Sequence, residues 1–293
     1  FFHMIQSICR GHYIHIIALW DIPMLLCIVV CNLAGLKIII QPKGSADFVS
    51  FKRKRRFKLI FAKLFLRSEK IIWLSSSNRE SDILRRIFKT ENIYSARYFL
   101  DKPLNSGNYR TVNFKSIKLI YLARLNWKKG LLEFIEKSRN YNFNQPIEMD
   151  VYGDADTSDY MNKLLSASIR SPLDIQFKGW VELGDGDLYA DYHYYLLPTF
   201  GENFGISIVE AMSIGKPIIT TNKVNIHNKI KQYGAGLISN NNLSDFRKKI
   251  KKYEQLSKKQ KSIMGINSLR CFDQNFDISL SKNSLNNFFL KNI

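Results

Sequence analysis

The sequence has few cysteines and histidines, and it lacks a long uninterrupted apolar run. Its four cysteines form no C-x-x-C pair, and a disulfide scaffold would show more of them at closer spacing, so we expect a reducing, cytoplasmic compartment. The five histidines show no metal-ligand spacing, so we expect no metal site. The most apolar stretch, residues 22–40, is interrupted by Pro23, Asn32, Gly35 and Lys37, and therefore predicts a buried helix and strand rather than a membrane span.

Acidic residues are also scarce, because 44 Lys and Arg stand against 25 Asp and Glu in 293 residues, a net charge of +19. Most of the excess lies in two runs, residues 51–70 and 247–261. Neither run has interleaved aromatic platforms or matches a nucleic-acid module, so we expect no nucleic-acid partner. In the first run apolar residues alternate with cations, which predicts an amphipathic helix suited to the anionic inner face of the cytoplasmic membrane. The alternative is a solvated helix whose apolar face packs on a sheet.

Apolar strand-like runs alternate with helix-like segments, without a repeat of solenoid length, and this pattern predicts α/β units with parallel sheets. The expected strands are 13–19, 36–41, 70–75 and 93–99, followed by 116–122, 147–152, 175–177, 194–197, 217–220 and 236–238. A polar stretch at 101–111 separates the two series. We therefore expect domains at 1–111 and 112–266 and a helical tail at 267–293 that packs back on the first domain.

The segment from Leu197 to Pro217, LPTFGENFGISIVEAMSIGKP, is the most informative. A short strand ends at its start, and a helix begins near Ile206 directly after a glycine. Such a helix start exposes backbone N–H groups, and the helix dipole favours an anion there, so we predict a phosphate site. Glu202 and Glu210 would repel that phosphate unless they bind hydroxyl groups farther out, as in sugar binding. In isolation, Glu202 could equally cap the helix and Glu210 could be solvated.

Three further strand ends carry candidate binding groups, one with cations and two with glycines. In YLARLNWKKG, residues 121–130, a strand delivers Arg124 and a helix start carries Lys129, so both cations can converge on one diphosphate. Taken alone, each is also an ordinary surface cation. In VYGD (151–154) and FKGWV (177–181), glycine after a strand lets a flat ring or a ribose approach the backbone.

In this order and spacing, these segments resemble the C-terminal domain of family 4 glycosyltransferases, which have the GT-B fold of two Rossmann-like α/β domains. The resemblance covers about residues 115–239, and PTFGENFGISIVEAMSIGKPII looks like the family's E-x7-E donor-binding block. Residues 13–23 (YIHIIALWDIP) and 38–44 (IIIQPKG) are similar to the first domain of bacterial polysaccharide and lipopolysaccharide enzymes, and Ser75 to Ser77 with Glu80 match the step that follows. Such domains open with a strand and a Gly-rich loop that this sequence does not show, so we expect an incomplete first domain.

The resemblance implies a role for each matching residue. Arg124 and Lys129 would neutralise the donor diphosphate, and Glu202 would hold the hydroxyls of the transferred sugar. Glu210 would bind the ribose of the nucleotide. The other donor-binding residues that it implies are Gly153, Val181, Asn203, Phe204, Gly205 and Ile206, and the acceptor-side residues are Lys43 and Gly44.

The implied activity is transfer of a sugar, with retention of anomeric configuration, from a nucleotide diphosphate sugar to a surface polysaccharide or lipid-linked glycan, such as lipopolysaccharide or capsule. Family members need neither metal nor cofactor, because protein cations and amides stabilise the leaving diphosphate. Two alternatives stay open: a non-catalytic remnant that binds a nucleotide sugar or a partner, and a GT-B sugar epimerase. A nicotinamide dehydrogenase is disfavoured, because no G-x-G-x-x-G follows a strand.

Overall fold

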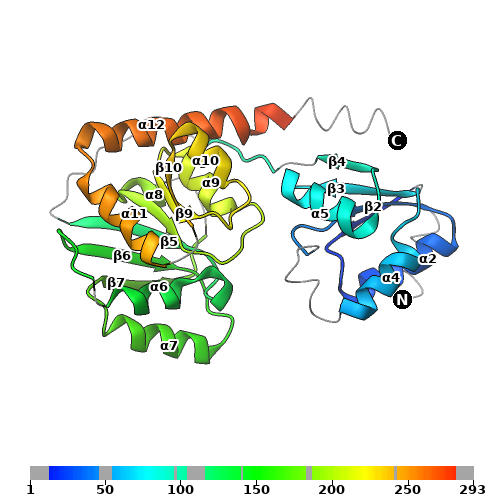
Figure 1. Ribbon diagram of the computed structural model, residues 1–293, viewed down its shortest axis with the longest axis horizontal. Helices are drawn as coiled ribbons and strands as arrows, with labels where there is room; N and C mark the ends of the chain where they lie inside the picture. The colour runs from blue at the N-terminus through cyan, green and yellow to red at the C-terminus, as the bar shows by residue number, and fades with distance from the viewer. Residues whose placement is uncertain are drawn as a thin grey trace. The chain divides into compact units, whose positions relative to one another are not determined.

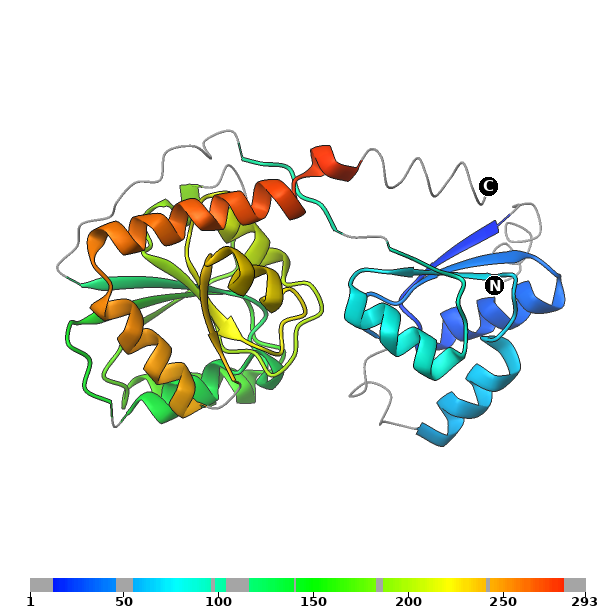
Figure 2. The ribbon, with the colours of Figure 1, turned by 45° about the horizontal axis from the view of Figure 1, so that its top comes forward.

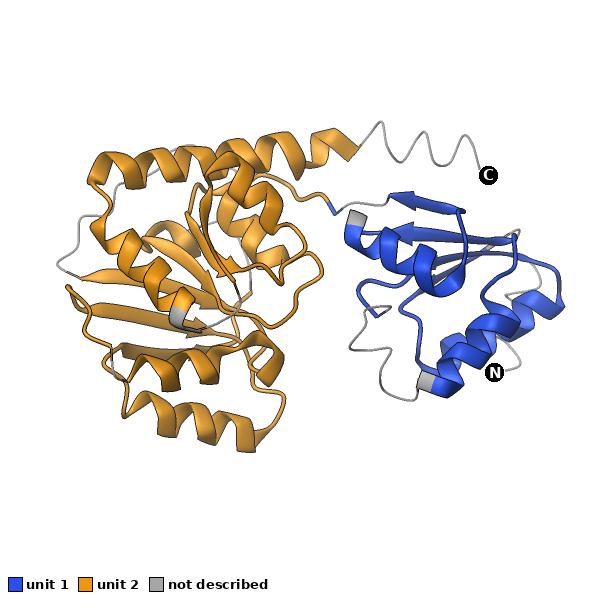
Figure 3. Ribbon diagram, in the orientation of Figure 1, with its two compact units in different colours: residues 1–98, 283–293 blue, residues 99–282 orange. Residues whose placement is uncertain are grey.

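The structure, a computed structural model, describes residues 13–45, 55–95, 98–103, 116–139, 141–182, 187–240 and 243–281. The chain divides into two compact units, residues 1–98 with 283–293 (unit 1) and residues 99–282 (unit 2), shown in Figure 3. The division after Tyr98 lies just before the polar stretch in which we expected the domain boundary.

Unit 1 contains a four-stranded parallel sheet in the order β1-β2-β3-β4. Its strands are β1 (Tyr13–Ile17), β2 (Lys37–Gln41), β3 (Ile71–Ser75) and β4 (Ile93–Ser95), and its helices are α2 (Ile22–Leu33), α4 (Arg55–Phe65) and α5 (Asn78–Phe88). Each strand pairs with the next one in sequence, so right-handed crossovers put the described helices on one face of the sheet (Figure 2). The main core of the unit lies on that face, where Trp73 stacks on Phe88 with ring centroids 4.4 Å apart.

Unit 2 contains a six-stranded parallel sheet in the order β10-β9-β8-β5-β6-β7. The strands are β5 (Ile117–Leu122), β6 (Ile147–Tyr152), β7 (Asp174–Gly179), β8 (Tyr194–Leu197), β9 (Ile218–Thr221) and β10 (Gly236–Ser239). The helices are η1 (Trp127–Lys129), α6 (Leu131–Ser138), α7 (Ser158–Ser168), α8 (Asp187–Ala190), α9 (Ile206–Ser213), α10 (His227–Tyr233), α11 (Leu243–Gln255), α12 (Lys258–Asn275) and η2 (Ile278–Leu280). The strand order reverses between β5 and β8, so α6 and α7 cover one face and α9, α10 and α12 the other (Figure 1).

The chain after α12 pairs with the segment that enters unit 2. α12 continues across the position where we expected the tail to begin, and it packs on α9 and α10. The N–H of Leu100 donates to the carbonyl of Phe276 at 2.9 Å, and the N–H of Ile278 donates to the carbonyl of Leu100 at 3.0 Å. The remainder of the expected tail, residues 282–293, lies outside the described residues.

The loops that follow the neighbouring strands β5 and β8 touch through their backbones. Gly130, which follows η1, has a φ of +73°, and a Cβ atom there would lie 2.1 Å from the carbonyl oxygen of Pro198. Beside it, the N–H of Phe200 donates to the carbonyl of Lys128 at 2.8 Å. The loop after β8 can therefore reach its position only because residue 130 has no side chain.

We expect Gly130→Ala to lower the free energy of unfolding by about 1–3 kcal/mol more than Gly179→Ala does. Gly179 is a matched control, because its φ of +74° imposes the same backbone strain but no heavy atom lies within 4 Å of an added Cβ. The difference between the variants therefore isolates the contact with Pro198. Urea denaturation measures both, and equal losses would contradict the close approach.

Candidate functional site

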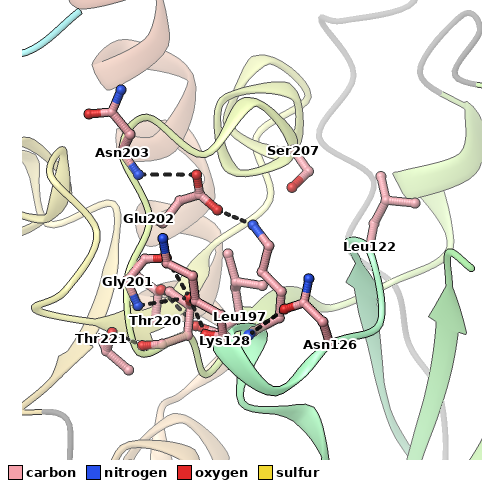
Figure 4. A network of polar contacts seen from close by, with 12 residues as sticks. Leu122, Asn126, Lys128, Leu197, Gly201, Glu202, Asn203, Ser207, Thr220 and Thr221 are labelled. Carbon is pink, nitrogen blue, oxygen red and sulfur yellow. Dashed lines mark hydrogen bonds and ion pairs between the residues drawn. The ribbon is translucent and has the colours of Figure 1, made fainter. Parts of the chain in front are cut away.

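A buried hydroxyl organises the loop after β8. The Thr199 hydroxyl shares its proton between the carbonyls of Lys128 at 3.0 Å and Gly201 at 3.1 Å, and it accepts the N–H of Gly201 at 3.1 Å. The hydroxyl of Thr221, at the end of β9, donates to the carbonyl of Thr199 at 2.6 Å. The segments that follow β5 and β8 and the end of β9 thus meet at Thr199. Its partners Lys128, Gly201 and Thr221 lie close together in Figure 4.

Glu202 lies in this loop and forms an ion pair with Lys129. The side chains of Lys129 and Glu202 are only 19% and 18% exposed, so solvent screens the pair poorly. The second carboxylate oxygen of Glu202 accepts the N–H of Asn203 at 3.1 Å (Figure 4). The structure therefore brings two of the predicted site residues into direct contact.

The turn after β9 fixes the backbone of Glu202. The N–H of Glu202 donates to the carbonyl of Lys223 at 3.1 Å, and its carbonyl accepts the N–H of Asn225 at 3.1 Å. The side-chain amide of Asn225 also donates to the side-chain oxygen of Asn203 at 2.9 Å. The sequence analysis missed Asn225, because nothing local to residues 221–226 indicates a contact with a loop twenty residues earlier.

The N-cap residue of helix α9 is Gly205, which has a φ of +78°. As a glycine, it provides no side-chain cap for the first N–H groups of the helix. The first N–H groups of a helix lack intrahelical acceptors and lie at the positive end of its dipole, so this end favours an anion. Phe204 is buried and packs edge-to-face on Phe276 with ring centroids 5.6 Å apart, so only its backbone can contribute to a site. Ile206, the first helical residue, is half exposed.

Glu210 lies within α9 and accepts the hydroxyl of Tyr189 at 3.2 Å. Burial raises the pKa of Glu210 above its ordinary value, and the hydrogen bond from Tyr189 works in the opposite direction. The Tyr195 hydroxyl donates to the carbonyl of Leu122 at 2.9 Å and shares a 2.7 Å hydrogen bond with Ser207. The face of α9 that carries Glu210 is thereby tied to the end of β5.

Lys216 holds the segment that carries Tyr189. Its side chain is buried, and its ammonium donates to the carbonyls of Ala190 at 2.7 Å and Tyr192 at 2.8 Å. Burial lowers the pKa of Lys216 to about 8. The sequence analysis missed this residue, although it is the only charged residue in the apolar segment 211–222.

Other predicted donor-side residues stand apart from this network. The side chain of Arg124 is 77% exposed and lies 4.0 Å from Asp156. Gly153 has a packing reason of its own, since a Cβ atom there would lie 2.1 Å from the carbonyl oxygen of Ala123. That reason differs from the ligand approach we expected of this glycine. Val181 follows β7 and is partly buried.

The predicted acceptor-side residues, Lys43 and Gly44, form a loop after β2 with positive φ angles of 49° and 85°. The buried carboxylate of Glu80 accepts the N–H of Gly44 at 2.7 Å. It also accepts the N–H and the hydroxyl of Ser76 at 2.8 and 2.6 Å. Lys43 is exposed, with its ammonium 5.7 Å from the centroid of the Tyr98 ring.

The described part of the chain holds neither a candidate membrane span nor a candidate metal cluster. No described helix is both long and apolar enough to cross a bilayer. Among the same residues, no group of three or more His, Cys, Asp and Glu side chains is arranged to hold a metal ion.

The two α/β units with parallel sheets have the GT-B fold, which solved glycosyltransferase structures share. The family described as "Glycosyl transferases group 1" matches residues 110–267. That match covers more than half of the 293 residues, and the chain belongs to this family. The narrower assignment to family 4 stays a prediction.

Solved structures share the fold over nearly the whole chain. HepE of Anabaena, in complex with UDP and glucose, is 14% identical with a TM-score of 0.78, and the match covers 99% of this chain and 80% of HepE. The sucrose-phosphate synthase of Thermosynechococcus elongatus is also 14% identical with a TM-score of 0.78, covering 99% and 76%. WaaG, a glycosyltransferase involved in lipopolysaccharide biosynthesis, is 15% identical with a TM-score of 0.61, covering 82% and 71%. No curated protein matches the sequence.

Lys216 makes a pH-dependent contribution to stability. Its folded-state pKa of about 8 lies below the ordinary value of 10.5, so the unfolded state binds more protons between these values and stability rises with pH there. We expect the free energy of unfolding of the parent, minus that of Lys216→Met, to increase between about pH 8 and 10 by up to about 1.4 kcal/mol per pH unit. Taking the difference cancels the tyrosines and cysteines common to both proteins. A difference that stays constant across this range would contradict the buried ammonium.

Proposed function

We propose that this chain transfers a sugar, with retention of anomeric configuration, from a nucleotide diphosphate sugar to a growing surface polysaccharide or lipid-linked glycan. The observation that carries the proposal is the pairing of Lys129 with Glu202 in the loop that leads into α9. A cation and free helix N–H groups suit a diphosphate, and a carboxylate beside them suits sugar hydroxyls. The bound UDP and glucose in HepE, which has the same fold, support this reading.

Glu210 is the proposed ribose ligand. A carboxylate accepts hydrogen bonds from two neighbouring hydroxyls, and the Tyr189 hydroxyl holds one carboxylate oxygen of Glu210 in place. Lys216 anchors the segment after Tyr189, and Tyr189 in turn orients Glu210. The buried Lys216 ammonium therefore helps to orient Glu210 without itself contacting the nucleotide. Glu210 is also partly buried, so a hydroxyl that bonds to it meets little competition from water.

The proposed chemistry follows from where charge develops. As the bond between the anomeric carbon and the phosphate oxygen breaks, negative charge grows on the leaving diphosphate. Lys129, Arg124 and the first amides of α9 would stabilise that charge, since all of them are donors supplied by the protein. We propose that the reaction therefore needs neither a metal ion nor a cofactor.

The acceptor is proposed to meet the loop of Lys43 and Gly44. This loop presents an exposed ammonium, and its backbone is held by the buried Glu80 rather than by the Lys43 side chain. A cation held in this way suits an acceptor with phosphate or carboxylate groups. Among the proteins of the same fold, WaaG acts in lipopolysaccharide biosynthesis, which supports a surface glycan as the acceptor class.

Nucleotide binding tests the donor site. In calorimetric titrations with UDP, GDP, ADP and dTDP and the matching nucleosides, Glu210→Gln should weaken nucleoside and nucleoside diphosphate alike, by about 1.5–3 kcal/mol. Arg124→Gln should weaken only the diphosphates, because it would face phosphate. The titration of the parent is repeated in EDTA, which should leave its affinity unchanged. Equal losses for both ligands in Arg124→Gln, or no loss in Glu210→Gln, would refute the assigned roles.

We further propose that unit 1 binds an anionic membrane through α4. Phe57, Ile60 and Leu64 form an exposed apolar stripe along this helix at i, i+3 and i+7, whereas Phe61 and Ala62 pack into the core. Arg56, Lys63 and Arg67 are exposed among them. Apolar side chains flanked by cations suit the interface of an anionic bilayer, which is where a lipid-linked acceptor would be presented. Residues 51–54 of the basic run lie outside the described residues.

Vesicle binding tests this surface. The double variant Ile60→Ser with Leu64→Ser should release the protein from vesicles of phosphatidylglycerol and phosphatidylcholine at about 0.15 M salt, since each buried apolar side chain contributes about 1.5–3 kcal/mol. Ile169→Ser is the control, because Ile169 is even more exposed than Ile60 and Leu64 but lies in unit 2. Nucleotide affinity should not change in either variant. Equal co-sedimentation of parent and double variant, or no binding by the parent, would rule out the membrane surface.

A further inference from the structure

Lys129 and Glu202 are each other's partners in this structure, although the proposed function gives each a different ligand group. The carboxylate of Glu202 uses one oxygen for the Lys129 ammonium and the other for the N–H of Asn203. A diphosphate that binds the Lys129 ammonium therefore competes with a carboxylate for it. Both side chains are mostly buried, so water replaces the lost partner poorly.

The backbone of Glu202 is held in place beside the incoming phosphate, because it is bonded on both sides. Its N–H is bonded to the carbonyl of Lys223 and its carbonyl to the N–H of Asn225. The side-chain bond between Asn225 and Asn203 fixes the next residue as well. The carboxylate therefore stays within side-chain reach of the place where Lys129 would hold the diphosphate.

The outcome differs between a sugar nucleotide and a nucleoside diphosphate. A sugar brings hydroxyl donors, which can replace the ammonium as partners of the Glu202 carboxylate. A nucleoside diphosphate brings none, so its binding leaves a mostly buried carboxylate without its cation and beside further negative charge. An unpaired buried charge is costly, and like charges at short range add to that cost.

We propose that Lys129 exchanges Glu202 for the donor diphosphate, and that Glu202 thereby weakens binding of the nucleoside diphosphate product relative to the sugar nucleotide. This inference rests on the proposed function and adds to it a device for product release. Before transfer, the sugar hydroxyls satisfy Glu202. After transfer, the sugar leaves with the acceptor, and the carboxylate competes with the diphosphate for Lys129.

The test compares dissociation constants of UDP, GDP, ADP and dTDP with those of their glucose conjugates, for the parent and for Glu202→Gln, using the pair that binds the parent most tightly. Glu202→Gln keeps the shape and the acceptor for the Asn203 N–H but removes the charge. We expect it to tighten nucleoside diphosphate binding about fivefold, the effect of one partly buried ion pair, while the sugar nucleotide gains less or loses affinity. The preference for the sugar nucleotide should therefore fall.

Glu148→Gln is the matched control. Glu148 also pairs with a lysine, Lys118, at 3.3 Å, but it lies near the start of β6, at the opposite end of the sheet from the ligand loops. It should leave the preference of the parent unchanged. Glu202→Ala is a second variant, which removes the charge without introducing an amide. It should also lower the preference for the sugar nucleotide over the nucleoside diphosphate. Thermal unfolding confirms that each variant folds.

The possible results separate the two ideas. If the parent binds a nucleoside diphosphate but both Glu202 variants bind it no more tightly, or tighten both ligands by the same factor, the partner exchange is wrong and the donor site stands. If the parent binds none of the nucleotides, the proposed function and the partner exchange fall together.

Discussion

The proposed donor site depends on the fully buried hydroxyl of Thr199. Parallel strands end at one edge of a sheet, and β5 and β8 are neighbours there, so the segments that follow them must share a small volume. The Thr199 hydroxyl bonds to both segments, and the Thr199 carbonyl takes a hydrogen bond from the end of β9. Lys129 and Glu202, which are 73 residues apart, face each other because this hydroxyl holds their backbones in register.

Each unit uses a buried charged side chain to shape a loop through backbone groups. In unit 1 the Glu80 carboxylate collects N–H groups from two loops, and in unit 2 the Lys216 ammonium collects two carbonyls. A buried charge is tolerated only where such partners surround it, so these residues are selective for one loop geometry. Glu80 bonds to the backbone of Gly44, and Lys216 bonds to the segment after Tyr189. Both charges therefore fix the position of proposed ligand-binding residues without a proposed ligand contact of their own.

The strands were predictable, because short apolar runs that alternate with helix-like segments are local signals. All ten expected strands occur, nine of them within two residues of their predicted bounds, whereas β4 ends at Ser95 rather than at residue 99. The pairing of Lys129 with Glu202 was not predictable, since it depends on which strands are neighbours in the sheet. For α4 the sequence predicted an amphipathic helix but not which of its apolar residues are buried. The structure shows that Phe61 and Ala62 pack in the core and that the stripe of Phe57, Ile60 and Leu64 is exposed. At Gly153 the structure adds a packing constraint that the sequence did not indicate, since a Cβ atom there would meet the carbonyl of Ala123.

The bond from Gly44 to Glu80 has a consequence for how this enzyme family can diversify. The loop after β2 is held by a main-chain N–H and by a carboxylate from another element, and neither depends on the side chain at position 43. Its left-handed backbone favours small or polar residues but fixes no charge there. Position 43 can therefore be exchanged during evolution, or in a library, without rebuilding the scaffold beneath it.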